Sequence, residues 1–270
     1  MWLHVEPTTR CNAWCPSCPR NKNGYGLATF VLEDLDPIRL KDVINIYNIK
    51  NVMLCGNLGD ALAAKNIEQQ LEVLTSIDKI QIRTNGSLRK PNWYTDLAKQ
   101  FGDKLEIWFA IDGLEDTHSY YRQGTDYKRI MENAKSFLQA GGTAVWQFIP
   151  FEHNQHQIKD CMRLSQQMGF KRFEFVKNAR VTENAYHYRT GKPLNIRAWS
   201  RDKNFNRKYT ISESVQPKNC MHLSMPSLYL GANGIVSPCC YMFKTEIETV
   251  DINKEFSNNS YRSVCIRNCG

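Results

Sequence analysis

The amino-acid sequence predicts an α/β protein built on a parallel β-sheet. Three observations support this prediction: six short strand-like runs in the first 180 residues, stretches of helical period between them, and their strict alternation. Strands and helices that alternate in this way imply parallel strands joined by right-handed crossovers. Periodicity alone does not distinguish an open sheet from a barrel. In either case, functional groups are expected at the carboxyl ends of the strands.

The six predicted strands are mostly apolar and rich in β-branched or aromatic residues, as buried parallel strands are. In chain order they are Trp2–Glu6, Asn51–Gly56, Lys79–Thr84, Lys104–Asp112, Thr143–Pro150 and Arg172–Lys177. Apolar residues at helical spacing mark two of the intervening helices. They are Ile67, Leu71, Leu74 and Ile77 in the first, and Ile130, Met131, Ala134, Phe137 and Leu138 in the second. The pair Gly141-Gly142 predicts the end of the second helix.

Length and composition restrict the class of protein. The chain has 270 residues, of which 42% are hydrophobic, so we expect either one large domain or one large domain with a small appendix. Thirty aromatic residues exclude a largely disordered chain. No apolar run approaches the roughly 20 residues that cross a bilayer. The start, MWLHVEPTTRC, has no signal-peptide pattern, so we predict a cytoplasmic protein without a membrane partner.

The chain has ten cysteines, and a reducing cytosol disfavours disulfides between them. Metal binding is therefore the better interpretation of these cysteines. Three of them, Cys11, Cys15 and Cys18, directly follow the first predicted strand. A structural zinc site has four protein ligands, and this loop supplies three. A 4Fe–4S cluster with one open iron fits three thiolates better, because the open iron can bind a substrate or cofactor.

The Cys-x3-Cys-x2-Cys loop resembles that of the radical S-adenosylmethionine (radical SAM) superfamily. The resemblance extends to Cys55-Gly-Asn-Leu-Gly-Asp60, Thr84-Asn-Gly86, Ala110-Ile-Asp-Gly113 and His118…Arg122-Gln-Gly124, which follow later strands or continue from them. It implies a partial (β/α)6 TIM-like barrel over residues 1–181. It also implies that Cys11, Cys15 and Cys18 ligate a 4Fe–4S cluster whose open iron binds SAM.

The resemblance also implies SAM contacts, with Gly56, Asn57 and Gly59 facing the ammonium, Asp112 the ribose, Arg122 the carboxylate and backbone at Val176 the adenine. Asn154 is a further polar candidate. Plainer interpretations remain open: an ordinary βα turn at 56–60, turn chemistry at Asp112, and a solvated cation at Arg122. Cys55 and Cys161 are expected to be packed thiols.

A second group of cysteines lies near the C-terminus. Asn233-Gly234 between two apolar runs predicts a β-hairpin that brings Cys220 and Cys239 together. A short helix from Asp251 through Arg262 is then expected to deliver Cys265 and Cys269. This spacing resembles the twitch domain, the shortened SPASM domain that binds one auxiliary 4Fe–4S cluster, here over residues 220–270. A four-cysteine zinc site is the alternative, and Cys240 is expected to pack.

Residues 182–219 are predicted to form a basic connector between the two domains. Residues 171–208 contain eleven Lys and Arg residues but only three acidic residues. The net charge of the chain therefore lies in this stretch, and the rest of the chain is formally neutral. A stretch that mixes basic and aromatic residues has three interpretations: a binding site for an anionic substrate, a binding site for a nucleic acid, or a solvated surface. We favour contact with an anionic substrate over contact with a nucleic acid.

The sequence therefore predicts a radical SAM enzyme with two 4Fe–4S clusters. It is expected to abstract hydrogen from a peptide, small metabolite or nucleotide, to take electrons from a flavodoxin or ferredoxin, and to act as a monomer. Its auxiliary cluster would support oxidation or bond formation. No catalytic acid or base is identified. The alternative is a non-catalytic, zinc-stabilised protein that binds nucleic acid.

Overall fold

The computed structural model describes residues 1–21, 30–176, 185–197, 199 and 227–240. Eight strands form one sheet in the order β10-β9-β1-β2-β3-β4-β5-β6. Their bounds are β1 Trp2–Val5, β2 Asn51–Leu54, β3 Lys79–Thr84, β4 Leu105–Ala110, β5 Thr143–Phe148, β6 Arg172–Phe175, β9 Ser227–Leu230 and β10 Val236–Ser237. All six strands predicted from the sequence are confirmed. Five of them are shorter than predicted, because terminal residues leave the sheet to form loops.

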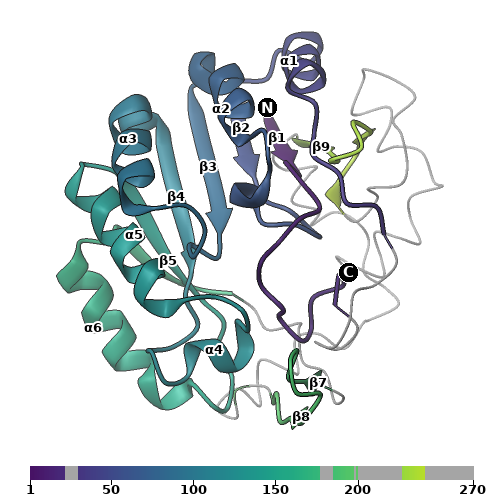
Figure 1. Cartoon of the computed structure of the whole chain (residues 1–270). Coiled ribbons are helices and arrows are strands. Elements are labelled where there is room, and N and C mark those ends of the chain that lie inside the picture. The colour runs from purple at the N-terminus through teal and green to yellow at the C-terminus, as the bar shows by residue number, and fades with distance from the viewer. Residues whose placement is uncertain (22–29, 177–184, 198, 200–226, 241–270) are drawn as a thin grey trace, which may run out of the picture.

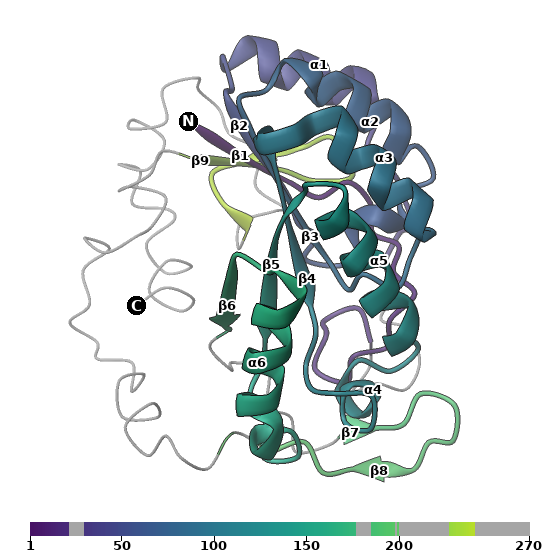
Figure 2. The same cartoon turned by 90° about the vertical axis from the view of Figure 1, so that its left-hand side faces the viewer.

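Strands β1 to β6 pair in parallel and in chain order, which confirms the predicted β-then-α arrangement. The sheet is a partial barrel, with β6 and β10 at its two edges. In the described ranges, the α-helices between the strands are α1 Pro37–Ile46, α2 Ile67–Val73, α3 Pro91–Phe101, α4 His118–Tyr121, α5 Tyr127–Gln139 and α6 Ile158–Met168. Short 3-10 helices lie at Ala61–Ala63, Leu74–Ser76, Gly102–Lys104 and Gln155–Gln157. Figures 1 and 2 show α1, α2, α3, α5 and α6 on one side of the sheet.

The helix ends follow local sequence signals. The Asp126 side chain accepts a hydrogen bond from the Arg129 N–H and so caps α5. That helix ends at Gln139, and Gly141 follows with a φ of +88°. In α2 the predicted stripe is buried throughout, but the α-helix ends at Val73 and continues as a 3-10 turn. Such a turn is a common way to tighten the last part of a helix.

The two faces of the sheet differ. Residues on the face toward the helices, such as Ile82, Phe109 and Trp146, are fully buried and form the main core. Their neighbours along the strands, such as Arg83 and Trp108, point to the other, inner face and are partly exposed. The alternation Lys-Ile-Gln-Ile-Arg-Thr in β3 follows from this difference. The inner face is therefore more polar than a strand buried on both faces.

The predicted hairpin is confirmed, and it extends the main sheet. Strand β9 pairs in parallel with β1, from Trp2 opposite Ser227 to Val5 opposite Leu230. Strand β10 returns antiparallel to β9 after a turn in which Gly234 has a φ of +78°. Most residues of the predicted connector and twitch domain, including the helix expected at 251–262, lie outside the described residues. The domain boundaries therefore stay a prediction.

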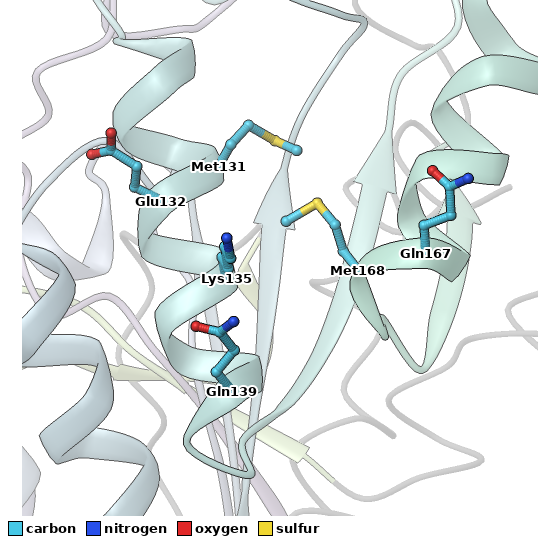
Figure 3. A pocket seen from close by; sticks show the side chains of 6 residues that line it. All are labelled: Met131, Glu132, Lys135, Gln139, Gln167 and Met168. Atoms are coloured by element: carbon cyan, nitrogen blue, oxygen red, sulfur yellow. The ribbon is translucent and has the colours of Figure 1, made fainter.

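Two further features lie outside the main sheet. Strands β7 (Ala185–Tyr186) and β8 (Pro193–Leu194) form a small antiparallel hairpin within the predicted connector. A groove also runs between α5 and α6, where Met131 and Met168 point toward each other (Figure 3). This groove belongs to the helix layer rather than to the strand ends. In the ranges that the structure describes, no helix has the length and apolar character needed to cross a membrane.

Candidate functional site

The three clustered cysteines lie in the loop that follows β1, at the carboxyl edge of the sheet. Cys15 is buried, whereas Cys11 and Cys18 are partly exposed. Successive turns shape the loop, because the Cys18 N–H donates to the Cys15 carbonyl at 3.1 Å and the Asn21 N–H donates to the Cys18 carbonyl at 2.9 Å. The Asn21 side-chain amide also donates to the Cys15 carbonyl, at 3.1 Å. One short segment thus presents three thiols.

Nitrogen donors point at two of these sulfur atoms. The Ala13 N–H donates to Cys11 Sγ at 3.3 Å, and Asn85 Nδ2 lies 3.9 Å from the same sulfur. Arg122 Nη1 lies 3.9 Å from Cys15 Sγ. Such donors favour a thiolate over a neutral thiol. This donor set fits a soft metal or an iron–sulfur cluster.

The local environment also affects the protonation of Cys11. Burial raises the pKa of its thiol above the ordinary range, and the charges of Asp60 and Cys15 raise it further. Metal binding would therefore have to displace this proton. Among the residues that the structure describes, no three or more His, Cys, Asp or Glu side chains lie close enough together to hold a metal ion, so the three thiols of this loop do not converge on one point in this structure.

The turn after β2 contains the predicted SAM-facing residues Gly56, Asn57 and Gly59. It is held to the end of β1 by Glu6, whose carboxylate accepts hydrogen bonds from the N–H groups of Leu58 and Gly59, the latter at 3.1 Å. Burial raises the pKa of Glu6, and these hydrogen bonds partly oppose the shift. A Cβ atom on Gly59 would lie 1.8 Å from the Thr8 carbonyl oxygen. Only glycine therefore allows this close approach of the two loops.

Asp60 joins the same turn to the loop after β3. Its carboxylate accepts hydrogen bonds from the Asn85 N–H at 2.6 Å and the Thr84 hydroxyl at 2.9 Å. Its own N–H donates to the Arg10 carbonyl at 2.8 Å. Burial raises the pKa of Asp60, while the hydrogen bonds lower it. Asp60 therefore ties the loops after β1, β2 and β3 together.

Asp112 and Arg122 form an ion pair below the cysteine loop. The Asp112 side chain is fully buried, and its Oδ2 accepts from Arg122 Nε at 2.6 Å. Its Oδ1 accepts from the Ile149 N–H at 2.7 Å. Burial lowers the pKa of Arg122, but the charges of Asp112 and Cys15 more than reverse this effect. Both oxygens of Asp112 are thus engaged within the protein, and the ribose and SAM-carboxylate contacts stay predictions.

The other two predicted contact residues lie on the adjoining loops. Asn154 is fully buried, donating to the carbonyls of Asp112 and Ile149 and accepting from the Phe151 N–H at 2.7 Å. In this structure it organises the loop after β5. Val176 packs in the small cluster that also contains Cys11 and Cys18, and its N–H donates to the Phe148 carbonyl. Val176 therefore lies near the cysteine loop, and the adenine contact stays a prediction.

Gln123 connects the cysteine loop to the β7–β8 hairpin. Its carbonyl accepts from the Trp14 N–H at 2.7 Å, and its side-chain oxygen accepts from the Tyr188 N–H at 2.8 Å. The rings of Trp14 and Tyr188 stack with their centroids 5.7 Å apart. Figures 1 and 2 both show the purple loop after β1 beside α4 and this hairpin.

Glu6, Asn85 and Gln123 had no predicted contact role, although Asn85 and Gln123 fall within the quoted motif stretches. For Asn85 and Gln123, the position within those stretches is the sequence feature that indicates a role near the site. For Glu6, the corresponding feature is an acidic residue at the end of the first predicted strand.

The described part of the C-terminal cysteine group adjoins the same edge of the sheet. Cys239 is buried after β10, and the Cys240 carbonyl accepts from Asn57 Nδ2 at 2.8 Å. Cys220, Cys265 and Cys269 lie outside the described residues, so the second ligand set stays a prediction. Cys161 is fully buried in the main core, which confirms its expected packing role.

Comparisons with known proteins identify the fold. No family model and no curated protein matches the sequence. Streptococcus suis SuiB bound to its precursor peptide SuiA aligns over 97% of this chain and 66% of SuiB, with 14% identity and a TM-score of 0.67. SuiB bound to S-adenosylmethionine aligns over 93% of this chain and 64% of SuiB, with 15% identity and a TM-score of 0.64.

A further solved structure is anSMEcpe with bound AdoMet and the Cp18Cys peptide. It aligns over 97% of this chain and 82% of its own length, with 14% identity and a TM-score of 0.60. In both SuiB comparisons the chain spans just under two thirds of the length of SuiB. At these identities the likeness establishes a shared fold.

Proposed function

We propose that this chain, which shares its fold with SuiB and anSMEcpe, is a radical SAM enzyme. Cys11, Cys15 and Cys18 would hold a 4Fe–4S cluster with one open iron. The observation that carries the proposal is the three-thiol loop at the carboxyl edge of the sheet, with N–H donors directed at Cys11 and Cys15. When bound, the reduced cluster supplies the electron that splits SAM into methionine and a 5′-deoxyadenosyl radical.

The protein's own residues would bind and orient SAM. Glu6 and Asp60 fix the turn at 56–60, which would present backbone groups of Gly56 and Gly59 to the SAM ammonium. Asp112 orients Arg122 so that its Nη1 lies beside Cys15. That cation would stabilise the negative charge of the cysteine-bound cluster and of the SAM carboxylate. Asp112 would thus act mainly through Arg122.

For the substrate, we propose a peptide from which hydrogen is abstracted. The support is that SuiB and anSMEcpe, two proteins of this fold, have been solved with bound peptides. Cys220, Cys239, Cys265 and Cys269 would hold one auxiliary 4Fe–4S cluster that supports oxidation or bond formation. A flavodoxin or ferredoxin would supply electrons in a reducing, cytoplasmic environment.

Anaerobic reconstitution followed by SAM and dithionite tests this proposal. The wild-type protein should contain about eight irons with matching sulfide and should form 5′-deoxyadenosine. Cys15→Ala should abolish that product, because one of the three cluster ligands is lost. Cys161→Ala is the matched control, since Cys161 is buried in the core. Two zinc ions with no iron, or 5′-deoxyadenosine formed by Cys15→Ala, would contradict the proposal.

A further inference from the structure

We infer that Arg83 on the inner face of the sheet is a binding group for an oxyanion, a carboxylate or phosphate carried by the substrate. The identification of this anion as part of a substrate rests on the proposed function. The anion-binding property rests only on the surroundings of Arg83.

Arg83 lies close to the cysteine loop. It is the last inner-face residue of β3 and pairs in register with Trp108 of β4. Ile82, its neighbour along the strand, is fully buried on the helix-covered face. Two residues after Arg83, the side chain of Asn85 reaches to 3.9 Å from Cys11 Sγ. Arg83 therefore lies near the carboxyl end of β3, two residues before the residue that reaches the cysteine loop.

The guanidinium of Arg83 has an incomplete set of partners. It lies over the Trp108 ring, with its Cζ atom 4.1 Å from the ring centroid. Its Nε is buried and has no hydrogen-bond partner in the part of the chain that the structure describes. Among the residues that the structure describes, no carboxylate forms an ion pair with Arg83. A buried donor without an acceptor is uncommon in native proteins and calls for an explanation.

Arg172 provides an internal comparison, because it contacts the same indole. Its Cζ atom lies 5.5 Å from the centroid of the Trp108 ring. Arg172 is paired with Glu106 and with Glu174, each at 3.1 Å. One of the two cations that flank Trp108 is thus paired with two carboxylates, of which Glu106 also pairs with Lys171 at 3.6 Å. Within the described ranges, no carboxylate compensates the charge of Arg83, which lies on the partly exposed inner face.

These surroundings favour an oxyanion as the missing partner. The contact with Trp108 orients the planar guanidinium before any ligand arrives. An arginine fork donates two parallel hydrogen bonds to a carboxylate or a phosphate. A preoriented cation near the proposed SAM site would therefore hold an anionic substrate group beside the reacting atoms.

The test is isothermal titration calorimetry on the oxidised, reconstituted holoenzyme saturated with SAM, using glutarate and inorganic phosphate as separate probes. Arg83→Gln should lower the affinity for the tighter-binding probe by about 10-fold or more, because a charge-assisted hydrogen bond is lost. Arg83→Lys should retain part of the affinity. Arg172→Gln is the matched control. It should change the affinity for the probe by less than about 3-fold, since Arg172 is already paired with Glu106 and Glu174.

Tighter binding of glutarate would identify a carboxylate, and tighter binding of phosphate would identify a phosphate ester. Failure of both probes to bind the wild type, or unchanged affinity in Arg83→Gln, would overturn the inference. Arg83→Met, which keeps an apolar chain over Trp108, replaces Arg83→Gln if that variant does not fold. Arg83-dependent binding in a protein that forms no 5′-deoxyadenosine would refute the proposed function and leave the anion site standing.

Discussion

At the scale of single residues, buried polar groups shape the candidate site. Asp112 and Arg122 pair at 2.6 Å, and the Asp112 side chain is fully enclosed. A buried pair is weak evidence for stability, because desolvation opposes the attraction between the charges. The pair does orient Arg122, whose other nitrogen reaches Cys15. Its value therefore lies in positioning a cation beside the proposed cluster.

His118 predicts a pH dependence of stability. It is fully buried, and burial lowers its pKa to about 3. Its Nδ1 accepts from the Asp112 N–H at 3.1 Å, which requires the neutral ring. Below a pH of about 6.5 the unfolded chain binds a proton that the folded protein does not, so stability falls with pH. The loss attributable to His118 should be about 2 kcal/mol between pH 6.5 and 5.

Urea unfolding of the wild type and His118→Asn over this pH range measures that loss. The difference in unfolding free energy between the two proteins isolates His118 from Glu6 and Asp60, whose raised pKa values act in the opposite direction. His156→Asn serves as the control, because His156 is exposed. The prediction would be refuted if the difference in unfolding free energy between the wild type and His118→Asn did not change with pH.

At the scale of elements, the loops after β1, β2 and β3 form one connected unit. Asp60 and Glu6 supply the hydrogen bonds, and Gly59 permits the close contact with Thr8. Helix and strand periodicity places these loops at one edge of the sheet. The hydrogen bonds then determine how closely the loops approach each other.

Gly59→Ala should disrupt this unit. The new Cβ would lie 1.8 Å from the Thr8 carbonyl oxygen, so one of the two backbones must move. We expect a loss of about 2–3 kcal/mol in unfolding free energy, as overpacking typically costs. Gly141→Ala is the control, with open space around the Cβ and only the strain of a φ of +88°. Equal losses in the two variants, measured by urea unfolding, would argue against the close contact.

At the scale of the whole molecule, the β9–β10 hairpin joins the main sheet beside the proposed site. The Tyr229 hydroxyl donates to Glu6, the residue that holds the turn after β2. The Asn57 side chain donates to the Cys240 carbonyl, which follows the hairpin. The segment that carries Cys239 is thus physically connected to the turn proposed to bind SAM.

Removing the Tyr229 hydroxyl should loosen that turn. In Tyr229→Phe, Glu6 loses one hydrogen bond, and the amides of Leu58 and Gly59 should exchange with solvent about 5- to 10-fold faster, as expected for a hydrogen bond worth about 1 kcal/mol. Hydrogen exchange measured by NMR checks this. Ser237→Ala is a matched control in the same hairpin, because the buried Ser237 hydroxyl has no hydrogen-bond partner to lose. Unchanged exchange in Tyr229→Phe would show that the hairpin and turn are independent.

Features that depend on local pattern could be predicted from the amino-acid sequence alone. Strand-like runs separated by helical stripes were enough to predict six parallel strands, and the spacing of Cys11, Cys15 and Cys18 identified the loop after the first strand. These features follow from periodicity and from covalent spacing, which nearby residues define.

Contacts between residues that are distant in the sequence became visible only in the folded chain. The Asp112–Arg122 pair, the addition of β9 to β1 and the contact of Arg83 with Trp108 all depend on strand register and loop closure. A one-residue shift in register would move Arg83 to the opposite face of the sheet. Register is fixed by the packing of the whole core, so no local segment of the sequence contains it.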